Sequence, residues 1–157
     1  MAIVRAVVPL MRAQGNLQWD DVYPNEQVFG ADIAAGQLWV AEMDRAIAGV
    51  AAITTEQSPE YADVGWDLNE AAIVVHRLAV DPAFRGRGVA DALMRQAEIV
   101  AREQGIAVLR IDTNTQNPAM HRLMPKLGYT LAGEIGLAFR PGLRFFCYEK
   151  RLPEAQP

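Results

Sequence analysis

The sequence predicts a mixed α/β fold built around one sheet. Short apolar runs of strand length alternate along the chain with segments whose apolar residues recur at helical spacing. The chain has 157 residues, 51% of them apolar, and this size matches one domain with a sizeable core. We therefore expect a single domain over residues 1–157 with one functional site.

The first predicted elements are a strand and two helices. The run IVRAVV at residues 3–8 predicts a short strand, and Pro9 then begins a segment with a helical apolar face. A second helix is predicted over residues 25–35, because Asn25 is a favourable N-cap and Gly36 supplies a left-handed stop.

Three strands are predicted next. Residues 37–43 and 46–55 form a hairpin pattern whose tight polar turn is Asp44-Arg45. Residues 56–70 predict a loop that carries aromatic side chains. The continuous apolar run at residues 71–80 is typical of a central strand buried on both faces.

The second half of the chain predicts a helix, a strand, a helix and two strands. The helices are expected over residues 90–101, stopped by Gly105, and from Asn117-Pro118 to Gly128. The strands are expected at residues 106–112, 131–139 and 143–150, the last two joined across residues 140–142. The complete predicted order is β-α-α-β-β-β-α-β-α-β-β.

Composition excludes several classes of function. The net charge of −4 argues against a general nucleic-acid binder, and no stretch approaches the ~20 apolar residues that cross a bilayer. Cys147 is the only cysteine and His76 and His121 are the only histidines, so neither a disulfide framework nor a metal site is expected. The amino terminus has no signal-peptide pattern, so the expected location is the cytoplasm.

The turn Arg85-Gly86-Arg87-Gly88 lies between an apolar strand pattern and a helix pattern. Glycines there let backbone amides approach a ligand, and the helix N-terminus and the two arginines favour an anion such as a diphosphate. The chain lacks the G-x-x-x-x-G-K-[ST] pattern of nucleotide triphosphatases, and the turn lacks the third glycine of a dinucleotide fingerprint.

The segment from Arg85 to Ala90 resembles the R/Q-x-x-G-x-G/A acetyl-CoA loop of the GNAT superfamily of N-acetyltransferases, and it follows a strand as that loop does. Residues 117–129, with Asn117, Leu123 and Lys126, are similar to the N-x-x-A-x-x-L-Y-x-K-x-G-F/Y segment of the same family. The two motifs occur in the family's order, and the resemblance is firm over residues 73–129.

The resemblance implies a GNAT-like fold and acetyl-CoA as cofactor. In that family the strands corresponding to residues 73–80 and 106–111 splay apart and hold the thioester between them. The loop amides would bind the pyrophosphate, and the strand end and Asn117 would bind the pantetheine arm. The implied cofactor-binding residues are Leu78, Ala79, Val80, Arg85, Gly86, Arg87, Gly88, Val89, Ala90, Asn117 and Lys126.

Acyl transfer to an amine needs a proton acceptor, because an alkyl ammonium has a pKa of about 10.4. His76 is the first candidate, since a histidine side chain has an unperturbed pKa near neutrality and this one lies on the strand expected to line the thioester. The alternatives are that His76 is a packed strand residue, or that Glu70 or Asp112 accepts the proton. For Asp112, the competing interpretation is that it only caps the end of its strand.

The leaving thiolate has no obvious proton donor. Much of the family has a Tyr directly after the helical Leu, whereas this chain has Met124 there, followed by Pro125. Tyr148 is the candidate general acid and Tyr129 is an alternative. Both also suit packed aromatic positions, and a thiolate can leave without help. The sequence further predicts Cys147 as a small buried residue and His121 as a surface residue.

The acceptor end of the site is predicted near residues 19–26. Trp19, Tyr23 and Glu26 would bind a cationic acceptor, and Trp66 would form the opposite wall. The alternative is that this segment is only a capped connection between two helices.

The sequence thus predicts an acetyl-CoA-dependent N-acetyltransferase that acts on a primary amine of a small molecule or peptide by direct attack in a ternary complex. The main alternative is a coenzyme A-binding sensor without catalysis, which the Met at position 124 keeps open. An O-acyltransferase or a longer acyl donor is a third hypothesis. The resemblance also implies that a homodimer can form through the carboxy-terminal strands.

Overall fold

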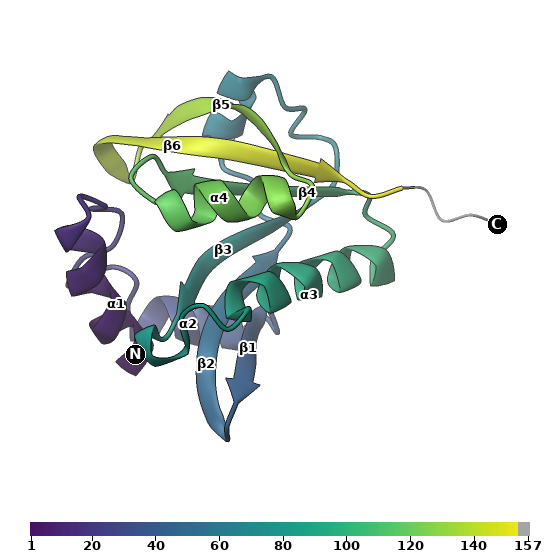
Figure 1. Ribbon diagram of the computed structural model, residues 1–157. Helices are drawn as coiled ribbons and strands as arrows, with labels where there is room; N and C mark the ends of the chain where they lie inside the picture. Colours follow the sequence, from purple (N-terminus) through teal and green to yellow (C-terminus); the bar gives the residue numbers. More distant parts are fainter. Residues whose placement is uncertain (154–157) are drawn as a thin grey trace.

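The computed structural model describes residues 1–153, which fold around a six-stranded sheet of order β1-β2-β3-β4-β6-β5 (Figure 1). The helices are α1 (Ala2–Ala13), α2 (Glu26–Ala34), α3 (Val89–Glu103) and α4 (Pro118–Lys126), with 3₁₀ turns η1 (Pro59–Val64) and η2 (Pro82–Phe84). The strands are β1 (Leu38–Met43), β2 (Ala46–Thr54), β3 (Ala72–Val80), β4 (Val108–Asn114), β5 (Thr130–Leu137) and β6 (Arg140–Arg151).

Helices cover both faces of this sheet. The largest core lies between the sheet and α3 and α4, where Ile73, Val75 and Leu109 pack against the helices. A second core joins α1 and α2 to the opposite face through Ala79 and Val50. Figure 1 shows α3 and α4 in front of the sheet and α1 at the left of the view.

A bulge in β3 changes which side chains face α1. Val75 faces α3 while Ala79 faces α1, although residues four apart on a regular strand share one face. The change occurs at Arg77, which has a φ of 51° and lies where the β2–β3 register shifts. The bulge therefore sets the orientation of His76 and of the strand end that follows it.

The sheet opens between its two central strands. β3 and β4 are parallel and pair only from Ala72 with Val108 to Val74 with Arg110. Beyond these pairs the strands separate, and the remaining parts of β3 and β4 form the two sides of a V. The splayed strands expected from the resemblance are thus present.

The amino-terminal prediction was wrong, because residues 2–13 form helix α1 rather than a strand. Val4, Val7 and Val8 are its buried residues, and their spacing forms one helical face against the sheet. Burial of this face outweighs the strand preference of β-branched residues, and Pro9 is accommodated inside the helix. The observed order therefore lacks the predicted first strand.

The carboxy-terminal turn was also misplaced. β5 ends at Leu137 and β6 begins at Arg140, which pairs with Leu137, so the turn is residues 138–139 and not 140–142. The register shifts after Gly136, where Gly142 has a φ of 82° on the opposite strand. The glycine thus marks an irregularity within β6.

The other predicted elements are confirmed, within a residue or two at most ends. Asn25 caps α2 through a bond from the Val28 amide, and Asp44 and Arg45 both have positive φ in the β1–β2 turn. The predicted loop at residues 56–70 contains η1. None of the helices within residues 1–153 has the length and apolar character needed to cross a membrane.

Candidate active site

A cavity of about 800 Å³ lies between the splayed strands. Residues 75–80 of β3 line one side, and Ile111, Asp112 and Thr113 of β4 line the other. The cavity extends from the turn before α3 to the segment that follows α1. Its size is that of a site for a cofactor or small ligand.

At one end of the cavity, the turn before α3 presents a row of free backbone amides. Within the described chain, the N–H groups from Gly86 to Asp91 donate to no protein acceptor. Gly86 and Gly88 have φ values of 73° and 78°, a conformation that L side chains rarely adopt. This cradle, at the positive end of the α3 dipole, suits a diphosphate.

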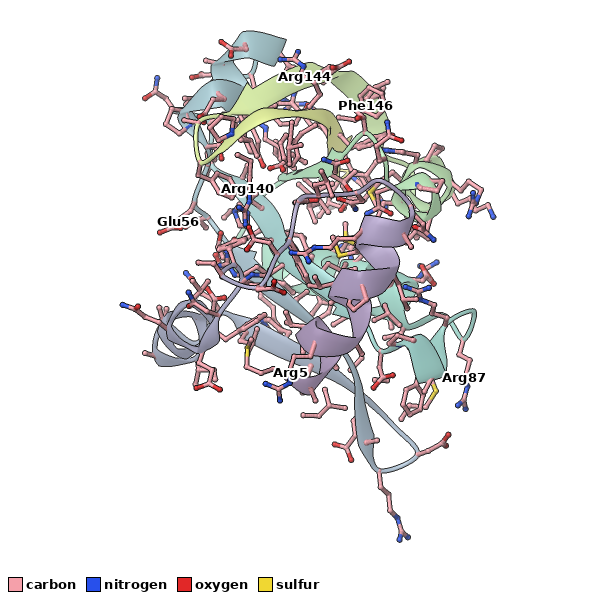
Figure 2. The ribbon with its side chains drawn as sticks, turned by 90° about the vertical axis from the view of Figure 1, so that its left-hand side faces the viewer. Arg5, Glu56, Arg87, Arg140, Arg144 and Phe146 are labelled. Atoms are coloured by element: carbon pink, nitrogen blue, oxygen red, sulfur yellow. The ribbon has the colours of Figure 1, made fainter. Side chains whose placement is uncertain are left out.

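The two arginines of the turn point in different directions. Arg85 lines the cavity together with Gly86, Gly88, Val89 and Ala90. Arg87 instead pairs with Asp44 at 3.0 Å and stacks on Phe84. Figure 2 shows Arg87 at the end of the molecule away from Arg140. Arg87 is therefore the predicted cofactor-binding residue of this turn that does not line the cavity.

The walls beyond the turn are largely apolar. Leu78, Ala79 and Val80 line the cavity from β3, and Leu123 and Lys126 line it from α4. Asn117 also reaches it, and its side chain accepts from the Met120 amide and donates to the Thr113 hydroxyl at 3.1 Å. An amide cradle joined to an apolar channel fits a cofactor with a diphosphate and a long thiol arm.

His76 and Asp112 face the cavity from the two sides of the V. His76 Nε2 lies 3.1 Å from the carbonyl oxygen of Glu56. A nitrogen in that position donates its hydrogen, which leaves Nδ1 as the atom that can accept a proton. The structure thus retains His76 as a candidate base.

Asp112 lies inside β4 and not at its end, contrary to the role at the strand end considered from the sequence. Its Oδ2 accepts a hydrogen bond from the buried Tyr61 hydroxyl at 2.6 Å. Burial raises the pKa of this carboxyl, whereas the Tyr61 bond and the charge of His76 act in the opposite direction. Glu70, the other carboxylate alternative, forms ion pairs with Arg110 and Arg151 instead.

Trp19 and Tyr23 line the cavity from the segment that follows α1, where the sequence predicts that the acceptor binds. A bidentate ion pair that the sequence analysis missed supports them. Arg77 donates to both oxygens of Asp32 at 2.6 Å, and its Nη1 donates to the Tyr23 hydroxyl at 3.3 Å. The sequence did contain a signal for this ion pair. Arg77 is a charged residue in the otherwise apolar β3, and Asp32 is a charged residue on the buried face of α2.

Arg140 is a second missed residue at this end. It pairs with Asp20 at 3.0 Å, and its guanidinium lies 5.1 Å from the Tyr23 ring centroid and 5.6 Å from that of Phe139. The amides of Tyr23 and Val22, together with Arg140, hold the pKa of Asp20 below its usual value. Asp20 is therefore already neutralised, and Asp21 pairs with Arg12. Both carboxylates between Trp19 and Tyr23 are thus paired with arginines.

Besides Arg87, three predicted site residues lie outside the cavity. Glu26 is exposed in the first turn of α2. Trp66 packs edge-on against Tyr61 and lies over the guanidinium of Arg110 at 4.8 Å, on another part of the sheet. Tyr148 is buried against α4, and burial raises its pKa. The strand position of Tyr148 and the path of the 56–70 segment direct Tyr148 and Trp66 away from the cavity.

His121 is not the surface residue that the sequence predicted. Its Nδ1 lies 2.9 Å from the Tyr148 hydroxyl, and its Nε2 lies 3.0 Å from the carbonyl oxygen of Asn114. The Nε2 hydrogen therefore goes to the carbonyl, and Nδ1 accepts the Tyr148 hydrogen. Cys147 is fully buried, as predicted, and burial raises the pKa of its thiol to about 12. Met124 is fully buried as well.

Comparison with known proteins agrees with this geometry. Residues 5–129 match the Acetyltransferase (GNAT) family. An uncharacterized N-acetyltransferase, YesJ of Bacillus subtilis, is 26% identical over 78% of this chain and 70% of its own length. Human N-acetyltransferase 8 is 28% identical over 73% of this chain, which spans only 43% of that protein.

Solved structures share the fold. A GNAT-family acetyltransferase from Streptococcus agalactiae has a TM-score of 0.82 and 27% identity, covering 98% of this chain and 88% of that one. The yncA acetyltransferase structure from Salmonella typhimurium, which holds its cofactor acetyl-CoA, has a TM-score of 0.68 and 22% identity, covering 99% and 90%.

The splayed sheet, the amide cradle and the apolar channel define an acyltransferase of the coenzyme A-dependent class. The chain belongs to the acetyltransferase (GNAT) family, and it is an acetyl-CoA-dependent N-acetyltransferase. The family resemblance and the fold class inferred from the sequence are thereby confirmed.

Proposed function

We propose that this N-acetyltransferase acetylates a primary amine of a small molecule or peptide by direct attack within a ternary complex. The observation that carries the proposal is that one continuous cavity joins the amide cradle at Gly86–Asp91 to His76 and Asp112. The cofactor and the amine would thus reach the same opening from opposite ends. The predicted cytoplasmic location and homodimer stay predictions.

When bound, acetyl-CoA supplies the acetyl group as a thioester. The amides from Gly86 to Asp91 and the Arg85 guanidinium would hold its diphosphate, while Leu78, Ala79 and Val80 would lie along its arm. Asn117 already bonds to Thr113 and to its own helix, so its proposed role is to shape the channel and to offer a remaining polar contact.

His76 would accept the proton of the attacking amine at Nδ1, with Nε2 held by the Glu56 carbonyl. The Asp112 carboxylate would stabilise the resulting imidazolium from the other side of the cavity. Charges on His76 and Asp112 interact favourably, which supports this division of roles. Trp19 and Tyr23 would border the amine substrate.

No dedicated acid is needed for the thiolate in this proposal. Met124, at the family's usual Tyr position, is fully buried, and Tyr148 donates to His121 away from the cavity. A thiol has a pKa of about 8.5 and leaves readily without protonation. The sequence candidate Tyr148 is therefore assigned to packing and to the His121 bond.

The proposal is tested by calorimetric titration with acetyl-CoA and by free-thiol release across a panel of primary amines. Binding followed by amine-dependent thiol release is the expected result. Binding without release for every amine would instead favour the coenzyme A-binding sensor, and alcohol-dependent release would favour an O-acyltransferase.

A further inference from the structure

The guanidinium of Arg140 lies directly behind two aromatic rings that line the acceptor end of the cavity. These are the rings of Tyr23 and Phe139, and the Arg140 side chain is only 16% exposed between them. Figure 2 shows Arg140 beside the segment that follows α1, well away from Arg144 on the same strand. A cation is thus held at the point where an acceptor would enter.

Only one edge of this guanidinium has a partner. Nη1 donates to Oδ2 of Asp20, whose Oδ1 accepts from the amides of Val22 and Tyr23 at 2.8 Å. Nε and Nη2 are buried and have no hydrogen-bond partner among residues 1–153. The Nε–Nη2 edge is a parallel pair of donors that matches the two oxygens of a carboxylate.

The other cation at this end is not available in the same way. Arg77 places both Nε and Nη2 on Asp32 and a further donor on Tyr23. Arg140 therefore holds the unused pair of donors. Buried donors without an acceptor are rare in folded proteins, because leaving them unpaired costs free energy. Such a pair, behind two rings that line the cavity, has the chemistry to bind an anion.

We infer that the Nε–Nη2 edge of Arg140 binds a carboxylate of the acetyl acceptor, so that the substrates are amines that also carry a carboxylate, such as free amino acids. This inference rests on the proposed function and names its substrate class. Asp20 neutralises the opposite edge, so the site favours a monoanion over a doubly charged phosphate. Binding would require the buried edge to become exposed, for example by rotation of the Phe139 ring, which packs on the guanidinium and is 54% exposed at the β5–β6 turn.

The test is calorimetric titration of the protein saturated with coenzyme A. The probes are glycine, methionine and phenylalanine, each compared with its α-carboxamide, which keeps the amine and side chain but removes the negative charge of the carboxylate. At least one amino acid should bind about tenfold or more tightly than its amide, as expected for a bidentate charge-assisted pair. Equal affinities within every pair, or no binding of any acid, would overturn the inference.

Variants of Arg140 test whether the preference for the acid over its amide depends on the Nε–Nη2 edge. Arg140→Gln should abolish it, and Arg140→Lys should lose most of it, because lysine keeps the charge but not the planar pair of donors. Arg144→Gln removes the same charge from an exposed position on β6 and should keep the preference. Retention of the preference in a folded Arg140→Gln or Arg140→Lys protein, shown by unchanged circular dichroism and acetyl-CoA affinity, would contradict the inference.

Thiol release with the same compounds separates this inference from the proposed function. A carboxylate preference in binding without any acetyl transfer would leave the Arg140 site standing and remove the proposed reaction. Acetyl transfer at equal rates to the acids and their amides would support the proposed reaction and remove the Arg140 site.

Discussion

The hydroxyl of Tyr61 donates to Oδ2 of Asp112 at 2.6 Å and so joins the η1 segment to the cavity side of β4. Tyr61 is fully buried and packs against Trp66, so the bond is held in a fixed geometry. Asp112 receives this bond while its carboxylate borders the cavity opposite His76. The loop that the sequence suggested as a substrate wall therefore contributes through Tyr61.

Tyr61→Phe should raise the pKa of Asp112 further above its ordinary value. Burial already raises this pKa, and the Tyr61 bond opposes the rise, so its removal favours the protonated carboxyl. The Asp112 carboxylate would then be lost at a higher pH than in the unmodified protein as the solution is acidified. A carboxyl ¹³C NMR titration measures the shift, and the acid limb of the rate profile should move the same way. Tyr129→Phe removes another buried hydroxyl, one without a partner in residues 1–153, and should leave both unchanged.

His76→Ala should lower kcat at neutral pH by about 10²- to 10⁴-fold, as expected for loss of a general base. Acetyl-CoA affinity should stay nearly constant, because the diphosphate cradle lies at the other end of the cavity. Steady-state rates across pH and calorimetry measure the two quantities. A pH–rate profile identical to that of the unmodified enzyme would show that His76 only packs in the strand.

The arginines of the α3 turn should differ in their effect on cofactor binding. Arg85→Ala removes a cavity-lining cation and should weaken acetyl-CoA binding about ten- to a hundredfold, the range of a hydrogen bond to a charged group. Arg87→Ala removes a cation paired with Asp44 and should change the Kd less than about twofold, since exposed pairs contribute little. Calorimetry measures the Kd for acetyl-CoA of both variants. Equal losses of affinity would contradict the different roles assigned to Arg85 and Arg87.

The cavity residues near the α3 turn were easier to predict from the sequence than those near the segment after α1. The cradle at Gly86–Asp91 and the Leu78–Val80 wall depend on local features, a glycine turn between a strand and a helix. Arg140 and Asp20, by contrast, are 120 positions apart in the chain, and no local pattern relates them. Their contact depends on how the β5–β6 hairpin packs against the segment after α1.

The first element shows a second limit of local patterns. Residues 3–8 contain four β-branched residues, which favour a strand locally. The structure has a helix there because Val4, Val7 and Val8 bury one face on the sheet. Tertiary burial of this kind is not visible until the sheet that receives the helix is known.

The Arg77–Asp32 ion pair should contribute strongly to the free energy of unfolding, because breaking it leaves a buried charge. The side chains are only 13% and 8% exposed, so Asp32→Asn leaves a buried guanidinium without its charge partner. The expected loss in the free energy of unfolding is about 3–5 kcal/mol. Glu134→Gln breaks the exposed pair with Arg144 and should cost about 0–1 kcal/mol. Urea denaturation of both variants measures the difference, and similar losses would show that burial does not control this pair.

Gly49→Ala should destabilise the protein and weaken acetyl-CoA binding together. A Cβ at this position on β2 would lie 2.6 Å from Cγ1 of Val89 and 3.0 Å from the carbonyl oxygen of Ala79. Because Val89 begins α3, the overlap would displace the helix end that carries the amide cradle. The expected loss in the free energy of unfolding is about 1–3 kcal/mol, typical of overpacking.

Gly30→Ala is the matched control for this substitution. Gly30 lies inside α2 with open space around the added Cβ, so the variant should gain about 0.5–1 kcal/mol from helix propensity and bind acetyl-CoA normally. Urea denaturation and calorimetry on the two variants give the comparison. If Gly49→Ala lost stability while its Kd for acetyl-CoA stayed unchanged, the position of α3 would not control the cradle, and cofactor affinity would depend on the turn residues alone.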